Sequence, residues 1–268
     1  ITPEEQYLVA NNLLFDVADA LDSLAPLGPR MDLLRASMGI AERLAQSDPS
    51  NADSQRDLGV IHDRIGDVLR SQGRLEEALK FYRTSMGIRD RLAESDPSNA
   101  DWQHSLSVSH AKIGDVLVSQ GRLEEALESY SATHAILERL ADIDPLNAGP
   151  QSDLAISHNR IGIALESQGR LEEALECYRT SIGIRERLAQ SDPSNATWQD
   201  GLGVSHEKIG DVLQAQGRLD AALNCYRASM GIRERLVEGA PSNAGWQRAM
   251  GVSQEKVGIV LESQGRLE

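Results

Sequence analysis

The sequence predicts an all-α fold, a right-handed superhelix of antiparallel helix pairs. The first observation behind this is a repeat of 48 residues: Ser71-Gln72-Gly73-Arg74 returns almost unchanged at Ser119, Ser167, Ala215 and Ser263. The second is the segment that begins with Asp48-Pro49, which recurs with the same spacing. A fixed period of this size is typical of a solenoid, in which each unit packs only on its neighbours.

Residues 50–97 show how the first helix of a unit is built. Ser50 and Asn51 can cap a helix start, and Asp53 follows Ser50 by three residues, as in a capping box. Apolar residues then recur at the spacing of one helical face. Gly73 is expected to end this helix in the left-handed conformation.

The second helix of the unit begins almost at once. Glu76 and Glu77 lie in its first turn, where the helix dipole favours acids. Asp96-Pro97 closes it, because the residue before a proline avoids the helical region. The same layout predicts helices near 51–71, 75–94, 99–119, 123–142, 147–167, 171–190, 195–215, 219–238 and 243–263.

An earlier, degenerate pair is expected near 3–23 and 30–46, with Ala25-Pro26-Leu27-Gly28-Pro29 as its turn. Eleven helices then form one domain over residues 1–268. We expect its parts to be a capping pair, four full repeats and a truncated repeat, at 1–49, 50–97, 98–145, 146–193, 194–241 and 242–268.

Small residues mark a second expected contact. Gly59 lies 14 residues before Gly73 and Gly87 lies 14 after it, so the two share a level in an antiparallel pair. Gly203 and Gly231 repeat this arrangement. A glycine inside a helix costs about 1 kcal/mol relative to alanine. We therefore expect each of these pairs to lie at a close helix crossing.

The residues that carry this pattern resemble the tetratricopeptide repeat family; they are Ile65-Gly66, Leu69, Gly73, Ala78 and Tyr82. The resemblance implies a solenoid whose first helices line a concave groove that binds proteins. The family unit has about 34 residues, whereas this unit has 48. Two added turns per helix keep the apolar face on the same side, so packing is preserved.

The charge and composition of the chain argue against several classes of function. The formal net charge is -14, which argues against nucleic-acid binding, since that needs a basic face. No apolar stretch is long enough to span a membrane and no signal peptide is visible. Cys177 and Cys225 lie one repeat apart, too far for a disulfide. We therefore expect a cytoplasmic protein with reduced cysteines.

A row of basic residues directly precedes the Gly-containing pair of each unit. In three units an acid follows the base by three residues. In another unit, an asparagine directly precedes the base. We call this set the first-helix row, and it is Arg64, Asp67, Lys112, Asp115, Asn159, Arg160, Lys208, Asp211 and Lys256. Two interpretations stay open: contacts to a ligand in the groove, or a solvated face of helix-stabilising salt bridges. On the same helix faces, further acids bring the acids above the bases in number, which favours a partner of basic or mixed charge; they are Asp63, Glu166, Glu207, Glu255 and Glu262.

Other residues are given structural roles. His62, His110, His158 and His206 are expected to be half-buried helix contacts, because neighbours one repeat apart cannot share a metal ion. The tryptophans are expected to close the end of the core. Residues 243–263 carry an apolar stripe of Met250, Val257, Val260 and Leu261. Because both chain ends look cut, we expect this stripe to contact another copy end to end.

No enzyme, cofactor or metal pattern is visible, because the glycines are all accounted for by turns or helix contacts. The leading hypothesis is a protein-interaction scaffold that binds a peptide or helix in its concave groove. One alternative is a structural spacer or self-assembly module, which near-identical repeats favour. Another is a sensor arm that regulates an enzyme domain outside these 268 residues.

Overall fold

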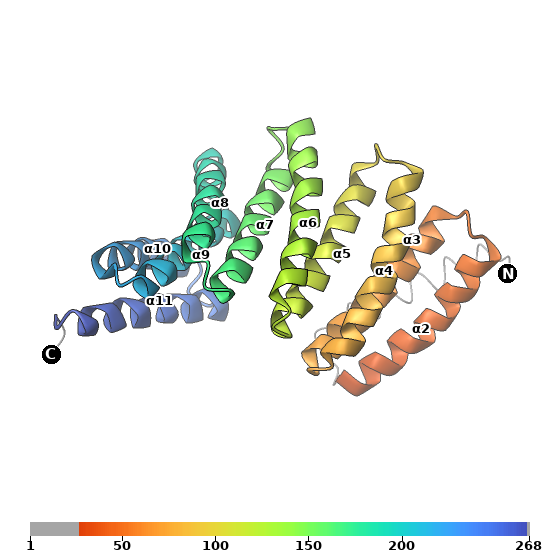
Figure 1. Cartoon of the computed structure of the whole chain (residues 1–268), viewed down its shortest axis with the longest axis horizontal. Coiled ribbons are helices and arrows are strands. Elements are labelled where there is room, and N and C mark those ends of the chain that lie inside the picture. Colours follow the sequence, from red (N-terminus) through yellow and green to blue (C-terminus); the bar gives the residue numbers. More distant parts are fainter. Residues whose placement is uncertain (1–26, 267–268) are drawn as a thin grey trace. The chain divides into compact units, whose positions relative to one another are not determined.

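The computed structural model describes residues 27–266, and within that range it contains ten α-helices and no strand. Figure 1 shows them in chain order. Their bounds are α2 Leu27–Ser47, α3 Ala52–Ser71, α4 Leu75–Ser95, α5 Ala100–Ser119, α6 Leu123–Ile143, α7 Ala148–Ser167, α8 Leu171–Ser191, α9 Ala196–Ala215, α10 Leu219–Gly239 and α11 Ala244–Ser263.

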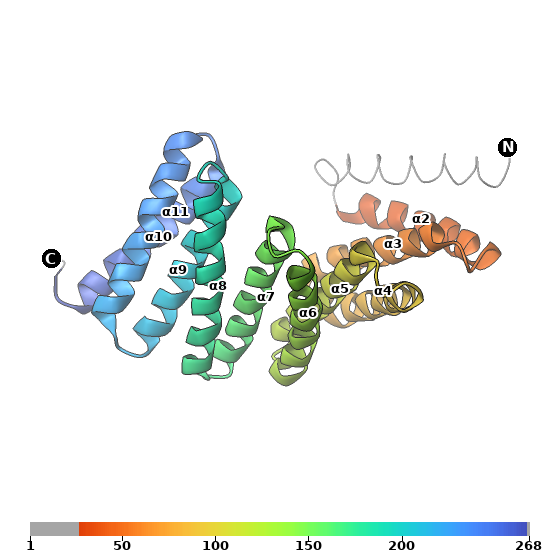
Figure 2. The same ribbon diagram turned by 90° about the horizontal axis from the view of Figure 1, so that it is seen from above.

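The chain divides into two compact units inside α6, between Thr133 and His134. In the first, α2 to α4 pack in succession, and α4 packs on α5. In the second, α7 to α11 do the same, and α7 also touches α9. Figure 2 shows these helices from above. The expectation that residues 1–268 form one domain stays a prediction.

The helix bounds agree closely with the sequence pattern. From α3 to α11, every helix begins and ends within one residue of its predicted position. The turn predicted at Ala25–Pro29 is wrong in its second half, because α2 already begins at Leu27. Pro29 falls in the first turn of that helix, where a missing N–H costs nothing. The helix predicted near 3–23 lies outside the described residues.

Glycine ends the first helix of each pair, as predicted. Gly73 has a φ of +75°, and Gly121, Gly169 and Gly217 have φ of 73–75°. At the first turn, Arg74 N–H donates to the carbonyl of Leu69 and Gly73 N–H to that of Arg70, at 2.9 Å each. These two bonds satisfy carbonyls that the helix leaves open, and they turn the chain back into the second helix.

The other turn is closed differently from our expectation. Asn51 is the N-cap of α3, and its side chain accepts a hydrogen bond from Ser54 N–H at 2.9 Å. Ser50 does not start a capping box with Asp53, because its hydroxyl donates instead to Asp48 at 2.6 Å. A proline follows Asp48, so the aspartate and Ser50 together form a side-chain-bonded turn before the cap.

The prediction that two glycines meet at each helix crossing is also wrong, because the glycine on the second helix does not lie there. A Cβ added at Gly87 or Gly231 would meet almost nothing, with only Arg235 Nη1 at 4.0 Å from the latter. Gly59 does lie at a crossing, but Ser85 faces it, and Ser85 Oγ donates to Gly59 O at 2.9 Å. Two residues at the same level along the axes of an antiparallel helix pair therefore need not lie on the faces where the helices meet.

The apolar stripe of α11 is partly covered. Val260 is completely buried within the chain, so it is not available for the expected contact with another copy. Val252 and Ile259 are the exposed apolar residues of this helix, at 37% and 43%. The buried side of α11 packs against α10, which accounts for the difference.

Candidate functional site on the first helices

The first-helix row lies on α3, α5, α7, α9 and α11, the first helix of each pair. Each of these helices carries its basic residue at the same repeat position, one residue before a Gly-containing pair. Each of the two units contains its own part of the row.

In the first unit, Asp67 is the centre of a three-residue cluster. Lys112 Nζ, from the next repeat, lies 2.8 and 2.7 Å from its two carboxylate oxygens. The hydroxyl of Tyr82 donates to Asp67 Oδ1 at 2.6 Å. Lys112 Nζ also lies 5.3 Å from the centre of the Tyr82 ring, within range of a cation–π contact. The cluster thus joins two successive repeats through side chains.

The second unit repeats this cluster around Asp211. Tyr226 donates to Asp211 Oδ1 at 2.8 Å, and Lys256 of the next repeat binds the same carboxylate. Lys256 Nζ lies 5.4 Å from the centre of the Tyr226 ring. Lys208 stands 3.9 Å from Asp211 on the same helix, the spacing expected from sequence. The strongest pair is therefore between repeats rather than within one helix.

Burial fixes the protonation state of the tyrosines. Tyr82 and Tyr226 are fully buried, which raises the pKa of both phenols. The hydrogen bond to Asp67 raises the pKa of Tyr82 further, and Asp211 does the same for Tyr226. Both hydroxyls therefore remain donors at any ordinary pH, and each one holds its carboxylate in place.

The remaining members of the row are also tied into the fold. Asp115 accepts a hydrogen bond from Tyr130 at 2.8 Å and lies 3.8 Å from Arg70. Arg64 and Arg160 both interact with neighbouring groups. Asn159 is 7% exposed, and its side-chain oxygen accepts no hydrogen bond from the described residues.

The four histidines that recur along the first helices are buried or half-buried. His62 is buried and lies with its ring centre 5.6 Å from that of Phe81. Burial lowers the pKa of His62, His110 and His206, and it lowers the pKa of His158 to about 4. No three His, Cys, Asp or Glu side chains among residues 27–266 gather closely enough to hold a metal ion.

The tryptophan and cysteine expectations agree with the structure where it describes them. Trp198 packs against a buried cluster of Ala155, Ile184 and Leu188, which closes the end of the core there. Cys177 and Cys225 are both free and half-buried, and burial raises the pKa of both thiols. Neither thiol has the lowered pKa of a reactive cysteine.

A buried ion pair that was not predicted from the sequence lies beside the row. Arg89 Nη1 lies 2.8 Å from Asp63, and both are under 10% exposed. The same guanidinium donates to Ser109 Oγ at 2.8 Å and to the Ser105 carbonyl at 3.2 Å. In the second unit Arg233 binds Glu207 in the same way.

A signal for this pair was present in the sequence. The two residues of the pair are 26 positions apart, and they change together from repeat to repeat. The four combinations are Asp63 with Arg89, Ala111 with Leu137, Asn159 with Arg185, and Glu207 with Arg233. A charged residue occurs opposite a charged or polar one, and an apolar residue occurs opposite an apolar one.

Family models for the tetratricopeptide repeat match residues 61–95, 105–187 and 207–241. The chain belongs to the tetratricopeptide repeat family. The matched segments together cover more than half of its length, and they contain the Gly, Ala and Tyr positions on which the resemblance rested. No curated protein matches the chain.

Solved structures of tetratricopeptide type share the fold. BtubC (BKLC) from P. vanneervenii is 17% identical, with a TM-score of 0.68 over 90% of this chain and 85% of that one. A Podosopora anserina putative kinesin light chain with nearly identical TPR-like repeats is also 17% identical, with a TM-score of 0.59 over 85% and 97% of the two chains. At this identity the likeness establishes the all-α tetratricopeptide solenoid and nothing about ligands.

Among the described residues of this tetratricopeptide chain, none of the helices combines the length and apolar character needed to cross a bilayer.

Proposed function

We propose that the chain is a protein-interaction scaffold that binds a peptide or helix of a partner along its first-helix row. The observation that carries this proposal is the repeated cluster of aspartate, tyrosine and next-repeat lysine at Asp67 and Asp211. Each cluster offers a partner a partly exposed carboxylate that is held in place by its neighbours. The tetratricopeptide fold, commonly used to bind proteins, agrees with this role.

The clusters are ordered before any partner arrives. Tyr82 and Lys112 already fix Asp67, so a partner that binds there loses little further side-chain freedom. Asp67 keeps 42% of its side-chain surface exposed and Lys112 keeps 23%. A carboxylate has about four acceptor positions, so Asp67 retains the capacity to accept a donor from a partner. This supports a partner of basic or mixed charge.

The competing interpretation is that these pairs only fasten one repeat to the next. Exposed salt bridges contribute about 0–1 kcal/mol to stability, so the two interpretations predict different results for charge reversal. Arg160→Glu with Lys208→Glu should abolish retention of partner proteins from an extract of the source cells. The matched variant carries Arg179→Glu with Arg227→Glu, which lie one repeat apart on the second helices α8 and α10.

If the first-helix row binds the partner, only the first variant loses it, and binding weakens as salt rises from 0.1 M to 1 M, since the Debye length falls from about 10 Å to about 3 Å. Equal retention by both variants would leave the row a structural feature and overturn the proposal. Both variants are checked for an unchanged helical circular dichroism spectrum.

Self-assembly remains a second candidate because Val252 and Ile259 lie exposed on α11. Exposed apolar side chains on one helix favour contact with another surface. Sedimentation velocity of the chain and of a Val252→Ser, Ile259→Ser variant tests this. Association that disappears in the variant would support self-assembly, and a monomer at all concentrations would contradict it.

A further inference from the structure

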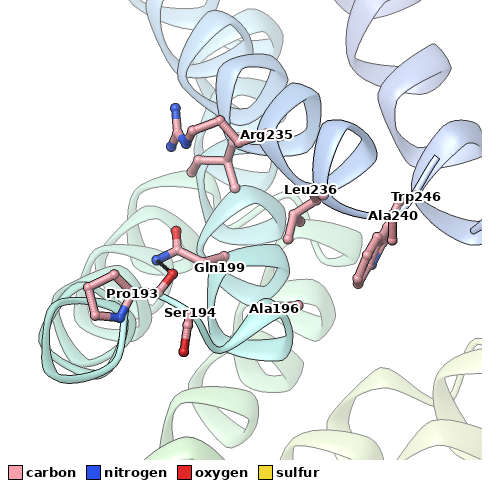
Figure 3. Close-up of a pocket in the computed structure, with 10 residues that line it drawn as sticks. Pro193, Ser194, Ala196, Gln199, Arg235, Leu236, Ala240 and Trp246 are labelled. Atoms are coloured by element: carbon pink, nitrogen blue, oxygen red, sulfur yellow. Dashed lines mark hydrogen bonds between the residues drawn. The ribbon is translucent and has the colours of Figure 1, made fainter.

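The turns between repeats form a second type of feature, separate from the first-helix row. The second unit contains two pockets at these turns, with volumes of about 530 and 440 Å³. Each pocket is lined by a proline turn, the start of the helix that follows it, and the last two turns of the next second helix. The larger pocket, at the Pro193 turn, is drawn in Figure 3.

The two pockets occupy the same position in successive repeats. Their lining residues correspond with a step of 48, as in Pro145 and Pro193, Ala148 and Ala196, Gln151 and Gln199, Ile184 and Ile232, Arg187 and Arg235, and Leu188 and Leu236. A pocket that returns at the same register is a property of the repeat rather than a local packing fault. We call these two the turn pockets.

Each turn pocket is apolar with one cation. Arg235 is the only ionisable residue that lines the larger pocket, and Arg187 is the only one that lines the smaller. Figure 3 shows Arg235 and Trp246 on opposite sides of Leu236. Both arginines are exposed, and neither makes an ion pair with any residue in the described range 27–266.

Two other arginines of these helices make ion pairs with described residues, whereas Arg227, like the pocket arginines, makes none. Arg233, two residues before Arg235, is buried and bound to Glu207. Arg179, on the same helix as Arg187, pairs with Glu176 at 3.3 Å. Arginine presents five N–H donors in a planar fork that fits a carboxylate through two bonds. The pocket arginines therefore keep this whole capacity for a molecule from outside.

The smaller pocket also exposes unusual apolar surface. Leu146 is 96% exposed and Ile143, just before the turn, is 79% exposed. In the next turn Ser194 occupies the position of Leu146, and its hydroxyl donates to Asp192 at 2.6 Å. Leu146 cannot make that hydrogen bond. This turn therefore lacks the side-chain bond and has a solvent-exposed apolar side chain in its place. Such a side chain gains free energy when another molecule covers it.

We propose that the turn pockets are a docking site for an extended segment of another protein in which apolar side chains alternate with carboxylates. An apolar side chain enters each pocket, and a neighbouring carboxylate binds Arg187 or Arg235. Two equivalent pockets in successive repeats favour one continuous segment, because the second contact then forms at a high effective concentration. The net charge of -14 opposes the approach of an acidic segment in general, so its binding depends on local cations such as these two.

The test uses fluorescence anisotropy of a labelled synthetic peptide that contains two leucines, each flanked by glutamates. Arg187→Ala with Arg235→Ala should weaken its binding by about tenfold or more, the loss expected for charge-assisted hydrogen bonds. Arg179→Ala with Arg227→Ala, on the same two helices, is the matched control and should leave binding within about twofold of the original chain.

A peptide with glutamine in place of every glutamate should bind the original chain as weakly as the glutamate peptide binds the pocket variant. Arg160→Glu with Lys208→Glu should leave peptide binding unchanged, which separates this site from the first-helix row. The proposal is overturned if the glutamate peptide shows no saturable binding, or if the control pair weakens binding as much as the pocket pair does.

Discussion

Gly66 lies directly against the ring of Tyr82, and a Cβ at Gly66 would stand only 2.6 Å from Tyr82 Cε1. The same contact recurs at Gly114, Gly162 and Gly210 with the tyrosine 16 residues later. Tyr82 in turn donates its hydroxyl hydrogen bond to Asp67. The glycine therefore sets how closely the two helices approach, and through the tyrosine it sets where the charged cluster stands.

Gly66→Ala should destabilise the chain by about 1–3 kcal/mol, because the added methyl group overlaps a buried ring. Gly87→Ala is the matched control: it also lies inside a helix, but a Cβ there meets no atom within 4 Å. That substitution should stabilise by about 0.4–1 kcal/mol. Urea denaturation measures both, and equal effects would show that the ring contact does not require glycine.

A second pair of substitutions tests whether Gly203 and Gly231, which the sequence predicted to meet at one crossing, differ in their packing. Gly203→Leu should lower stability by about 1–3 kcal/mol, since a Cβ there already lies 3.6 Å from Ser229 Oγ and 3.7 Å from Ile232. Gly231→Leu should not lower the melting temperature, because its Cβ would meet only the mobile end of Arg235. A large loss in the Gly231 variant would restore the crossing predicted from sequence.

The buried Asp63–Arg89 pair offers a rescue experiment. Asp63→Ala should cost about 3–5 kcal/mol, because Arg89 is left as a buried charge without its carboxylate. Adding Arg89→Leu should recover most of that loss, since Ala111 and Leu137 occupy the same two positions in the next repeat. Chemical denaturation of the single and double variants measures this. A double variant no more stable than Asp63→Ala would contradict the inferred coupling.

The helices were predictable because their signals are local. Gly73 adopts a left-handed conformation after the first helix, and Pro97 cannot continue the second. A single residue type therefore marks where each helix ends. Asn51 rather than Ser50 became the cap because Asp48 and Ser50 bond each other, a competition that residue types alone do not decide.

The site was only partly predictable. The row of bases could be found from its period, but Lys112 binds Asp67 from 45 residues away. That pairing depends on which helix faces meet between repeats, and helical spacing inside one unit contains no information about this. The same limitation explains why Gly87 was placed at a crossing that Ser85 occupies.

Acid should destabilise the chain through His158. Burial, followed by the positive charge of nearby His134, lowers the pKa of His158 from 6.5 to about 4. The unfolded chain therefore binds more protons between these two values, and stability is lost as the pH falls through that window. The melting temperature should be lower at pH 5 than at pH 7.

His158→Gln should reduce this pH dependence, because glutamine does not titrate, and Gln254 already occupies the equivalent position in the last repeat. The ring centres of His134 and His158 lie 4.6 Å apart, so His134 must be kept in the variant. The same fall in melting temperature with and without His158 would assign the acid sensitivity to other groups.

Binding of partners along the first helices can be mapped by hydrogen–deuterium exchange of the chain, free and bound to a partner protein retained from the source extract. We predict slower exchange in the complex at the exposed faces of α3, α5, α7 and α9, centred on Asp67, Lys112 and Asp211. Protection confined to the second helices α4, α8 and α10, with none on the first helices, would contradict the account.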